Sequence, residues 1–302
     1  MAAVFLCESR GQEAPSQWDF KVIETPHFRI IYNAKQQELG DYYAREVENV
    51  FAKVAAYFTE WPSKVALVLT DRTDLPNGYA TVVPYPLIVL YPVVPMANDS
   101  LSGFRNWGFE LLGHELTHIM SFVPTRDFVT PLRYVFGSIV APNLLMPLWW
   151  KEGVAVALES VDGGGRLNSD YQESLLRAFV LEDRLSEISI ADVNEVGAEW
   201  PEGLKPYLFG SLIWKELVER KGGKVFDNLV LAQSGRIPYL INDPVKEEVG
   251  LNYEGVYREA LAKIVEKVKA DTATLSAVAP SKYEEVAKRR KDVEKIVKVI
   301  IP

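Results

Sequence analysis

The stretch His114-Glu115-Leu116-Thr117-His118 places two histidines four residues apart, with a glutamate directly after the first. On an α-helix, residues i and i+4 project from nearly the same face, so both imidazoles can bind one metal ion. Imidazole nitrogens are common zinc ligands. Glu115 then points to one side, where its carboxylate can take a proton from a metal-bound water. The pattern therefore predicts a zinc hydrolase with His114 and His118 as ligands and Glu115 as general base.

The residues around this motif are typical of a helix. Ser102 is a candidate N-cap, and the first proline after the motif is Pro124. Trp107, Leu111 and the two histidines follow one another by four, three and four residues, so the histidines continue an apolar stripe that faces the core. Buried imidazoles need partners. The alternative to a metal is that both are core histidines bonded to backbone carbonyls or carboxylates.

A catalytic zinc usually has three protein ligands, and the segment from Pro147 to Glu159 contains a candidate for the third. Its sequence, PLWWKEGVAVALE, predicts a second buried helix in which Glu152 and Glu159 are the acidic residues. They are two turns apart on one face. Gly153 lowers helix stability, and we expect it to let this helix approach another closely. The alternative is that Gly153 only makes the start of the helix flexible.

HELTH followed by WWKEGVAVALE resembles the gluzincin metallopeptidases, the clan of thermolysin-like and alanyl-aminopeptidase-like enzymes. The resemblance implies one Zn2+ per chain, bound by His114, His118 and Glu152. It also implies that Glu115 is the general base and that Glu159 is a carboxylate outside the ligand set that orients a ligand or the site. The alternative for Glu159 is a solvated helix end.

A longer stretch, roughly from Pro26 to Ala178, is similar to bacterial peptidase-MA-like domains, which often precede TolB-type β-propellers. The matching segments are PHFRIIY, NGYATVVPYPLIVLY, GHELTHI, PLWWKEGVAVALES and GGGRLNSDYQESLLRA. No repeats of blade length follow, so we expect a stand-alone member or a piece of a longer protein whose C-terminal domain is missing. Such domains are usually exported, which favours the periplasm or cell envelope over the cytoplasm. Residues 1–17 lack a basic start, and their apolar core is too short for an intact secretory signal. They are therefore interpreted as a tail or as the remnant of a trimmed signal.

Hydrolysis also needs a hydrogen-bond donor for the oxyanion of the transition state. The third histidine of the chain, His27, lies far upstream, which disfavours a histidine donor. Pro206-Tyr207-Leu208-Phe209-Gly210 is similar to the tyrosine-x-x-glycine element of aminopeptidase-like gluzincins, and this implies that Tyr207 binds the transition state. Phe209 departs from the lysine that is common there. The alternative is that the Tyr207 side chain only packs against other residues of the fold.

Substrate contacts are expected upstream of the first metal helix. Asn77–Val83 and Leu87–Tyr91 predict two short strands joined by a proline-rich turn. An exposed edge strand beside the zinc would bind an extended peptide as an added strand, through Tyr79, Ala80 and Thr81. The alternative is a core hairpin. The chain lacks a glycine-x-methionine-glutamate-asparagine element, and this favours an endopeptidase.

The fold class expected from these elements is α+β, and the resemblance implies a thermolysin-like, gluzincin-type catalytic architecture. A mixed N-terminal sheet with a long helix from Gln37 to Phe58 precedes a mainly helical part, and the active site lies in the cleft between them. The chain is long enough and apolar enough, at 48% hydrophobic residues, to bury a sizeable core. The expected parts are a tail at 1–17, a sheet-containing subdomain at 18–101, a helical zinc-binding subdomain at 102–270 and a helical extension or linker at 271–302.

The net charge of -8 argues against general nucleic-acid binding, which relies on clustered lysine and arginine. A basic run, Lys288-Arg289-Arg290-Lys291, is interleaved with acidic residues in a predicted helix from Lys282 to Val299. We interpret it as a solvated face, or as part of a linker toward further sequence.

An uncharged stretch at 134–150 separates Arg133 from Lys151. Glycine, asparagine and prolines interrupt it, and a membrane-spanning helix needs about 20 predominantly apolar residues. We therefore expect no transmembrane segment and a buried connection between the two zinc helices. The alternatives are a hydrophobic lid over the cleft, or a surface that rests on a membrane or a partner.

The glycine run Gly163-Gly164-Gly165 is followed by Arg166. It lacks the lysine and Ser/Thr of a phosphate loop and follows a helix rather than a strand. We interpret it as a turn from which Arg166 reaches the cleft.

These features together predict a zinc-dependent peptidase that acts on peptide or protein substrates. One alternative is an inactive gluzincin-fold module for peptide binding or envelope assembly. Another is a zinc hydrolase of non-peptide amides or esters, which would use the same residues.

Overall fold

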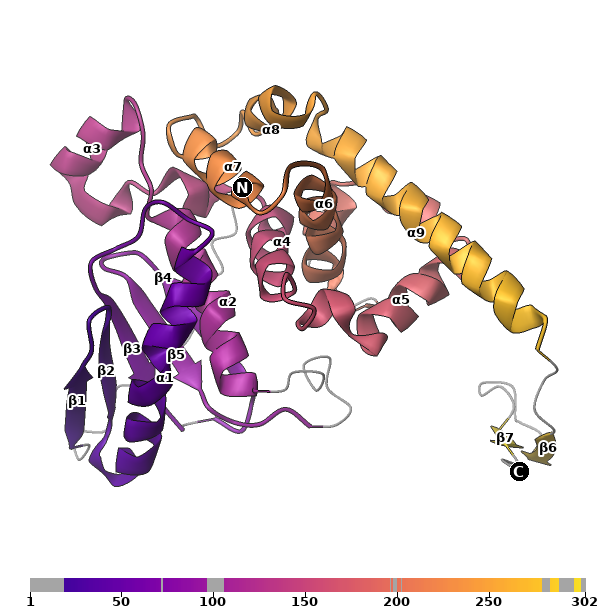
Figure 1. The fold of residues 1–302 in the computed structure, drawn as a ribbon, viewed down its shortest axis with the longest axis horizontal. Helices are drawn as coiled ribbons and strands as arrows, with labels where there is room; N and C mark the ends of the chain where they lie inside the picture. The colour runs from indigo at the N-terminus through magenta and orange to yellow at the C-terminus, as the bar shows by residue number, and fades with distance from the viewer. Residues whose placement is uncertain are drawn as a thin grey trace. The chain divides into compact units, whose positions relative to one another are not determined.

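The computed structural model describes residues 19–71, 73–96, 106–195, 197, 200–201, 203–278, 283–287 and 296–299. The chain divides into two compact units, one that extends to Ala260 and one that begins at Leu261. The first unit joins a five-stranded sheet to a set of helices, which confirms the α+β class (Figure 1). Among the described helices, none has both the length and the apolar character needed to span a membrane.

The sheet of the first unit has the strand order β1-β2-β3-β5-β4. Its three inner strands are parallel to one another, and each outer strand is antiparallel to its neighbour. Among the described strands, β4 pairs only with β5, so β4 is an edge strand. This agrees with the expectation that one strand of the predicted pair at 77–91 lies at an edge. The strands are β1 (Phe20–Glu24), β2 (Phe28–Asn33), β3 (Val65–Leu69), β4 (Asn77–Thr81) and β5 (Leu87–Tyr91).

Helix α1 (Gln37–Ala55) packs on β2 and on helix α2. Its buried residues Tyr43, Val47, Phe51 and Val54 are spaced four, four and three apart, which gives the helix one apolar face. The helix ends three residues before the predicted Phe58.

Helix α2 (Trp107–Phe122) carries the histidine motif and lies in the centre of the unit (Figure 1). It contacts α1, α4, β4 and β5, and every residue from His114 to Phe122 is buried. The predicted N-cap Ser102 lies outside the described residues. A helix covered on so many sides holds its histidines in fixed positions, because its side chains are packed against several neighbours.

Helices α4 (Leu148–Glu159) and α6 (Lys205–Lys221) cross at two glycines. A Cβ atom on Gly153 would lie 2.5 Å from the backbone of Gly210, so the helices can approach this closely because neither residue has a side chain. Beside the crossing, the Trp214 indole Nε1 donates a hydrogen bond of 3.0 Å to the carbonyl oxygen of Trp150. The close approach predicted for Gly153 is confirmed.

The uncharged stretch at 134–150 is not the buried connection that the sequence predicts. It begins in helix α3 (Val129–Phe136), where Tyr134 is 93% exposed, and Ile139 just beyond is 70% exposed. The chain returns to the core at Asn143, whose amide nitrogen donates to the carbonyl oxygens of Ser121 and Val230. Buried packing thus begins only around this anchor, and the part before it is an apolar surface.

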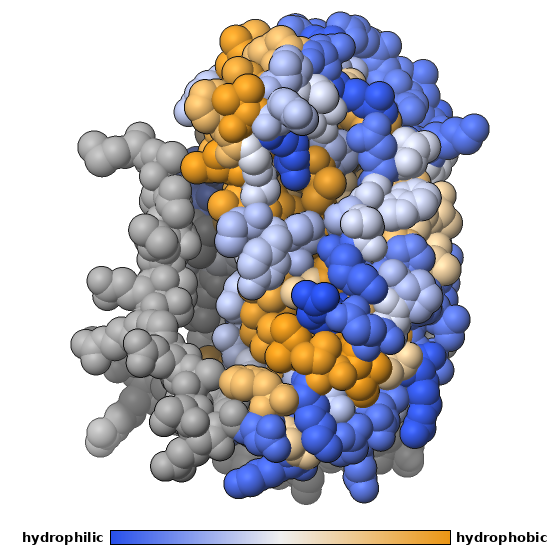
Figure 2. Space-filling view, turned by 90° about the vertical axis from the view of Figure 1, so that its left-hand side faces the viewer, coloured by the Kyte–Doolittle hydropathy of each residue, from blue (hydrophilic) through white to orange (hydrophobic). Residues whose placement is uncertain are grey.

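This surface lies over α3, which extends at the upper left of Figure 1. Figure 2 views the molecule from the left-hand side of Figure 1 and shows apolar side chains gathered in the upper part of this face. Between residues 128 and 145, on α3 and the chain that follows it, the exposed large apolar residues are Phe128, Leu132, Tyr134, Val135, Phe136, Ile139 and Leu145. Contact of this surface with a membrane or a partner stays a prediction.

The predicted helix from Lys282 to Val299 is wrong. Strands β6 (Tyr283–Ala287) and β7 (Ile296–Val299) form an antiparallel pair in the second unit. β7 consists mostly of valine and isoleucine, and these β-branched residues favour extended backbone, whereas β6 contains one such residue, Val286. The basic run between them lies outside the described residues. Further α-helices of the protein are α5 (Asp170–Leu181), α7 (Lys224–Ser234), α8 (Asn242–Val249) and α9 (Tyr253–Ser276).

Candidate active site

Three side chains from α2 and α4 bring ligand atoms to one point. The Nε2 atoms of His114 and His118 are 3.2 Å apart. The Oε2 atom of Glu152 lies 3.3 Å from the first and 3.4 Å from the second. Ligands at the corners of a tetrahedron with metal bonds of about 2.0–2.1 Å lie about 3.3 Å from one another. This nearly equilateral triangle therefore has the size and donor types that zinc requires, and these three residues could hold it.

Helix geometry and packing explain the triangle. The two histidines lie one turn apart on the buried face of α2, with their rings at an interplanar angle of 89°. α4 packs against α2 and brings Glu152 to them from the opposite side. Two of the three donors are thus fixed within a single helix, while the third depends on the packing of two helices.

The neighbouring groups stabilise the charged forms of His114 and Glu152. Burial and Arg166 oppose protonation of His114, but hydrogen bonds with Glu152 and Glu159 outweigh them and raise its pKa to about 9. Burial would raise the pKa of Glu152, but His118 and His114 hold it well below the usual range. Glu152 is therefore a carboxylate at neutral pH. A metal bound to His114 would displace a proton, so metal uptake and proton release are coupled.

Glu115 lies in the same cavity wall as the triangle, with 5% of its surface exposed. Burial raises its pKa, while the nearby histidines act in the opposite direction. A carboxylate with a raised pKa is a stronger base than a solvated one, which suits a group that takes a proton from water and later returns it.

The three donor atoms of His114, His118 and Glu152, called the ligand triangle, lie in the wall of a cavity of about 620 Å³. One wall is the edge strand β4, and the others come from α2, α4 and the start of α6. Tyr79 and Ala80 line it, and their contact with a substrate stays a prediction. The described residues of the cavity wall do not include Thr81, the third residue predicted to contact substrate. Its hydroxyl accepts from the backbone nitrogen of Val83 at 3.1 Å and donates to the carbonyl oxygen of Val83 at 3.0 Å.

The sequence did not identify several other residues of the cavity wall. They are apolar side chains at helical spacing, which also pack in the core, and a lysine that precedes Glu152; such residues carry no chemical signature of a site. These residues are Trp107, Leu111, Phe122, Leu144, Lys151 and Leu204.

Tyr207 lies at the start of α6 and lines the cavity. Its ring is 6.5 Å from that of His114, with an interplanar angle of 25°. The negative charge of Glu152 and burial raise the pKa of the Tyr207 hydroxyl far above the physiological range. The hydroxyl therefore keeps its proton and can donate a hydrogen bond toward the ligand triangle.

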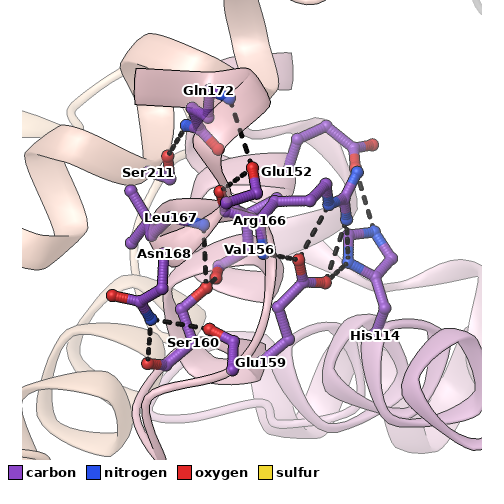
Figure 3. A network of polar contacts seen from close by, with 12 residues as sticks. His114, Glu152, Val156, Glu159, Ser160, Arg166, Leu167, Asn168, Gln172 and Ser211 are labelled. Carbon is purple, nitrogen blue, oxygen red and sulfur yellow. Dashed lines mark hydrogen bonds and ion pairs between the residues drawn. The ribbon is translucent and has the colours of Figure 1, made fainter. Parts of the chain in front are cut away.

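Glu159 and Arg166 lie behind His114 (Figure 3). The Oε2 atom of Glu159 is 3.0 Å from His114 Nδ1, the nitrogen that faces away from the triangle. The side chain of Glu159 is 4% exposed, so the alternative of a solvated helix end is wrong. Arg166 lines the cavity, which confirms that it reaches the cleft from its turn, and its Nε donates to Glu159 Oε1 at 2.8 Å.

His27 lies outside this group. Its Nδ1 atom is 2.7 Å from Glu48 Oε2, and its ring stacks on Phe51. The sequence argument against His27 as an oxyanion donor thus agrees with its position directly before β2 and in contact with α1.

No protein-family model matches the chain. An uncharacterized protein of Treponema pallidum (strain Nichols) is 29% identical over 196 residues, which are 63% of this chain and 17% of that protein.

Two solved structures overlap most of the chain. An M1 zinc metallopeptidase from Deinococcus radiodurans is 17% identical, with 80% of this chain and 51% of that chain covered and a TM-score of 0.44. Leukotriene A4 hydrolase from Saccharomyces cerevisiae is 14% identical, with 77% and 36% covered and a TM-score of 0.46. The chain thus spans about half or less of the length of each.

Proposed function

We propose that the protein is a zinc-dependent peptidase of the gluzincin type. The observation that carries the proposal is the triangle of His114, His118 and Glu152 donor atoms, with edges of 3.2, 3.3 and 3.4 Å, beside the buried Glu115. A purely structural zinc site has four protein ligands and no base. Three ligands, an adjacent carboxylate and an open cavity favour a catalytic site.

The protein's own residues divide the work of hydrolysis. When bound, zinc would supply a Lewis acid that polarises a carbonyl and makes water more acidic. Glu115 takes the proton of the attacking water and returns it to the leaving amine. Glu159 accepts a hydrogen bond from His114 Nδ1 and so keeps Nε2 available as a ligand.

The edge strand β4 supports a peptide as the substrate. Its outer side has no partner strand among the described residues, and Tyr79 and Ala80 lie in the cavity wall. An extended substrate can add to such an edge through main-chain hydrogen bonds, which do not depend on the substrate's side chains. Recognition of main chain along the cleft favours an endopeptidase.

Tyr207→Phe is expected to lower kcat about 10²- to 10³-fold, the loss typical of one oxyanion donor, with a much smaller change in KM. The hydroxyl donates most strongly when negative charge develops on the substrate oxygen, so its removal affects the transition state more than the bound substrate. Steady-state kinetics on a cleaved peptide measure both constants. Tyr239→Phe, at a position that is 84% exposed, is the matched control. An unchanged kcat in Tyr207→Phe would remove this residue from the mechanism.

The experiment that tests the function is cleavage of a peptide library by the zinc-loaded protein, followed by mass spectrometry of the products. We expect internal cleavages that stop when a chelator removes the metal and return when zinc is added. Bound zinc without any cleavage would favour the inactive peptide-binding module. Hydrolysis of small amides or esters without peptide cleavage would favour a non-peptide hydrolase.

A further inference from the structure

The chain reverses direction directly after α4, through the glycine run. Gly163 and Gly165 have φ values of 82° and 69°, which side-chain-bearing residues rarely adopt. A Cβ atom on Gly165 would lie 2.5 Å from Ser160 Oγ, so this position also lacks room for a side chain. The turn therefore brings Arg166 back beside the end of the helix that carries Glu152 and Glu159 (Figure 3).

Hydrogen bonds hold this turn against α4. Ser160 Oγ accepts from the backbone nitrogen of Leu167 at 3.2 Å. The amide of Asn168 donates to the carbonyl oxygens of Ser160 at 3.0 Å and of Gly164 at 2.6 Å. The backbone is thus held both before and after Arg166. The Arg166 side chain therefore loses little further freedom when it binds the carboxylate of Glu159.

Arg166 holds both carboxylate oxygens of Glu159. Its Nε donates to Oε1 at 2.8 Å and its Nη2 to Oε2 at 3.0 Å, while its backbone nitrogen donates to Oε1 at 3.1 Å. Two parallel bonds from one guanidinium fix the plane of a carboxylate, which a single ammonium cannot do. The plane of Glu159 in turn sets the direction from which it accepts the Nδ1 hydrogen of His114.

The same guanidinium also lies close to His114. Its Nη2 is 2.7 Å from Nδ1, and Glu159 Oε2 is 3.0 Å from the same nitrogen. A neutral imidazole with hydrogen on Nδ1 donates to Glu159 and leaves Nε2 free for a metal, whereas Nδ1 that accepts from Arg166 leaves hydrogen on Nε2. The direction of the Glu159 carboxylate therefore decides which nitrogen of His114 is available to the metal.

We propose that Arg166 is a positioning residue of the metal site, which fixes Glu159 and through it the metal-binding form of His114. This inference rests on the proposed zinc site. It assigns a role to the glycine turn, whose shape is needed to direct Arg166 back to α4.

The test measures zinc affinity by competition with a chromogenic chelator, without substrate. Arg166→Met is expected to weaken zinc binding about 10- to 100-fold, the effect typical of groups that orient a metal ligand. Arg166→Lys keeps the charge but not the fork, and is expected to bind zinc more weakly than the natural protein and more tightly than Arg166→Met. Arg236→Met removes a surface arginine that pairs with Glu247 and serves as the control with unchanged affinity.

A double variant separates this role from general destabilisation. If Arg166 acts through Glu159, then Arg166→Met adds little to the loss caused by Glu159→Gln, because both interrupt one chain of contacts. Fully additive losses, or unchanged affinity in Arg166→Met, would overturn the proposal. If Arg166→Met does not fold, Arg166→Lys decides by the same criterion. A protein that binds zinc but cleaves no peptide would refute the peptidase while leaving this test intact.

Discussion

Glu115→Gln is expected to lower kcat/KM for peptide cleavage about 10²- to 10⁴-fold while the bound zinc remains. Glutamine has the shape of glutamate but cannot take a proton from water at neutral pH. Glu115 is not one of the three residues whose donor atoms converge, so the ligand triangle persists in the variant. Cleavage assays together with metal analysis of the same sample measure both quantities.

The control for this variant is Glu173→Gln on α5, which removes a surface carboxylate paired with Arg177. We expect its activity and zinc content to match those of the natural protein. Loss of zinc together with activity in Glu115→Gln would show that Glu115 holds the metal, and retained activity would show that another group is the base. Either result would contradict the assigned role.

The proximity of the two histidines on α2 could be predicted from the sequence because their geometry is local. His114 and His118 are one helical turn apart, so any helix here brings their rings together. Glu152 belongs to another helix, and periodicity alone cannot show that α4 packs against α2. Its prediction depended on resemblance. The glycine contact that fixes this packing could be predicted for Gly153 but not for its partner, Gly210.

Other features depend on tertiary contacts that leave little trace in the sequence. Glu159 is buried because Arg166 returns over the helix end, and a glycine run by itself indicates only a turn. Burial of 134–150 was inferred from apolar composition, but helix α3 has few neighbours and exposes Tyr134. Strand β6 could not be predicted from its residues, because YEEVA contains one β-branched residue and two glutamates, which favour a helix.

His118→Ala is expected to reduce zinc affinity by more than about 100-fold, beyond the loss typical of groups that only orient a ligand. The remaining pair, His114 and Glu152, provides two donors where a catalytic zinc usually has three. Native mass spectrometry of protein purified without a chelator should show one zinc in the natural protein and none in the variant.

Thermal unfolding provides a second measure of the same loss. A ligand that binds only the folded state stabilises it by about 2.7 kcal/mol at a concentration 100 times its Kd. Added zinc should therefore raise the Tm of the natural protein and leave that of His118→Ala nearly unchanged. His27→Ala is the matched control, since it removes the histidine that bonds to Glu48 and should keep the zinc-dependent shift. An equal shift in His118→Ala would mean that zinc binds elsewhere, and a protein without any shift would favour the peptide-binding module over the peptidase.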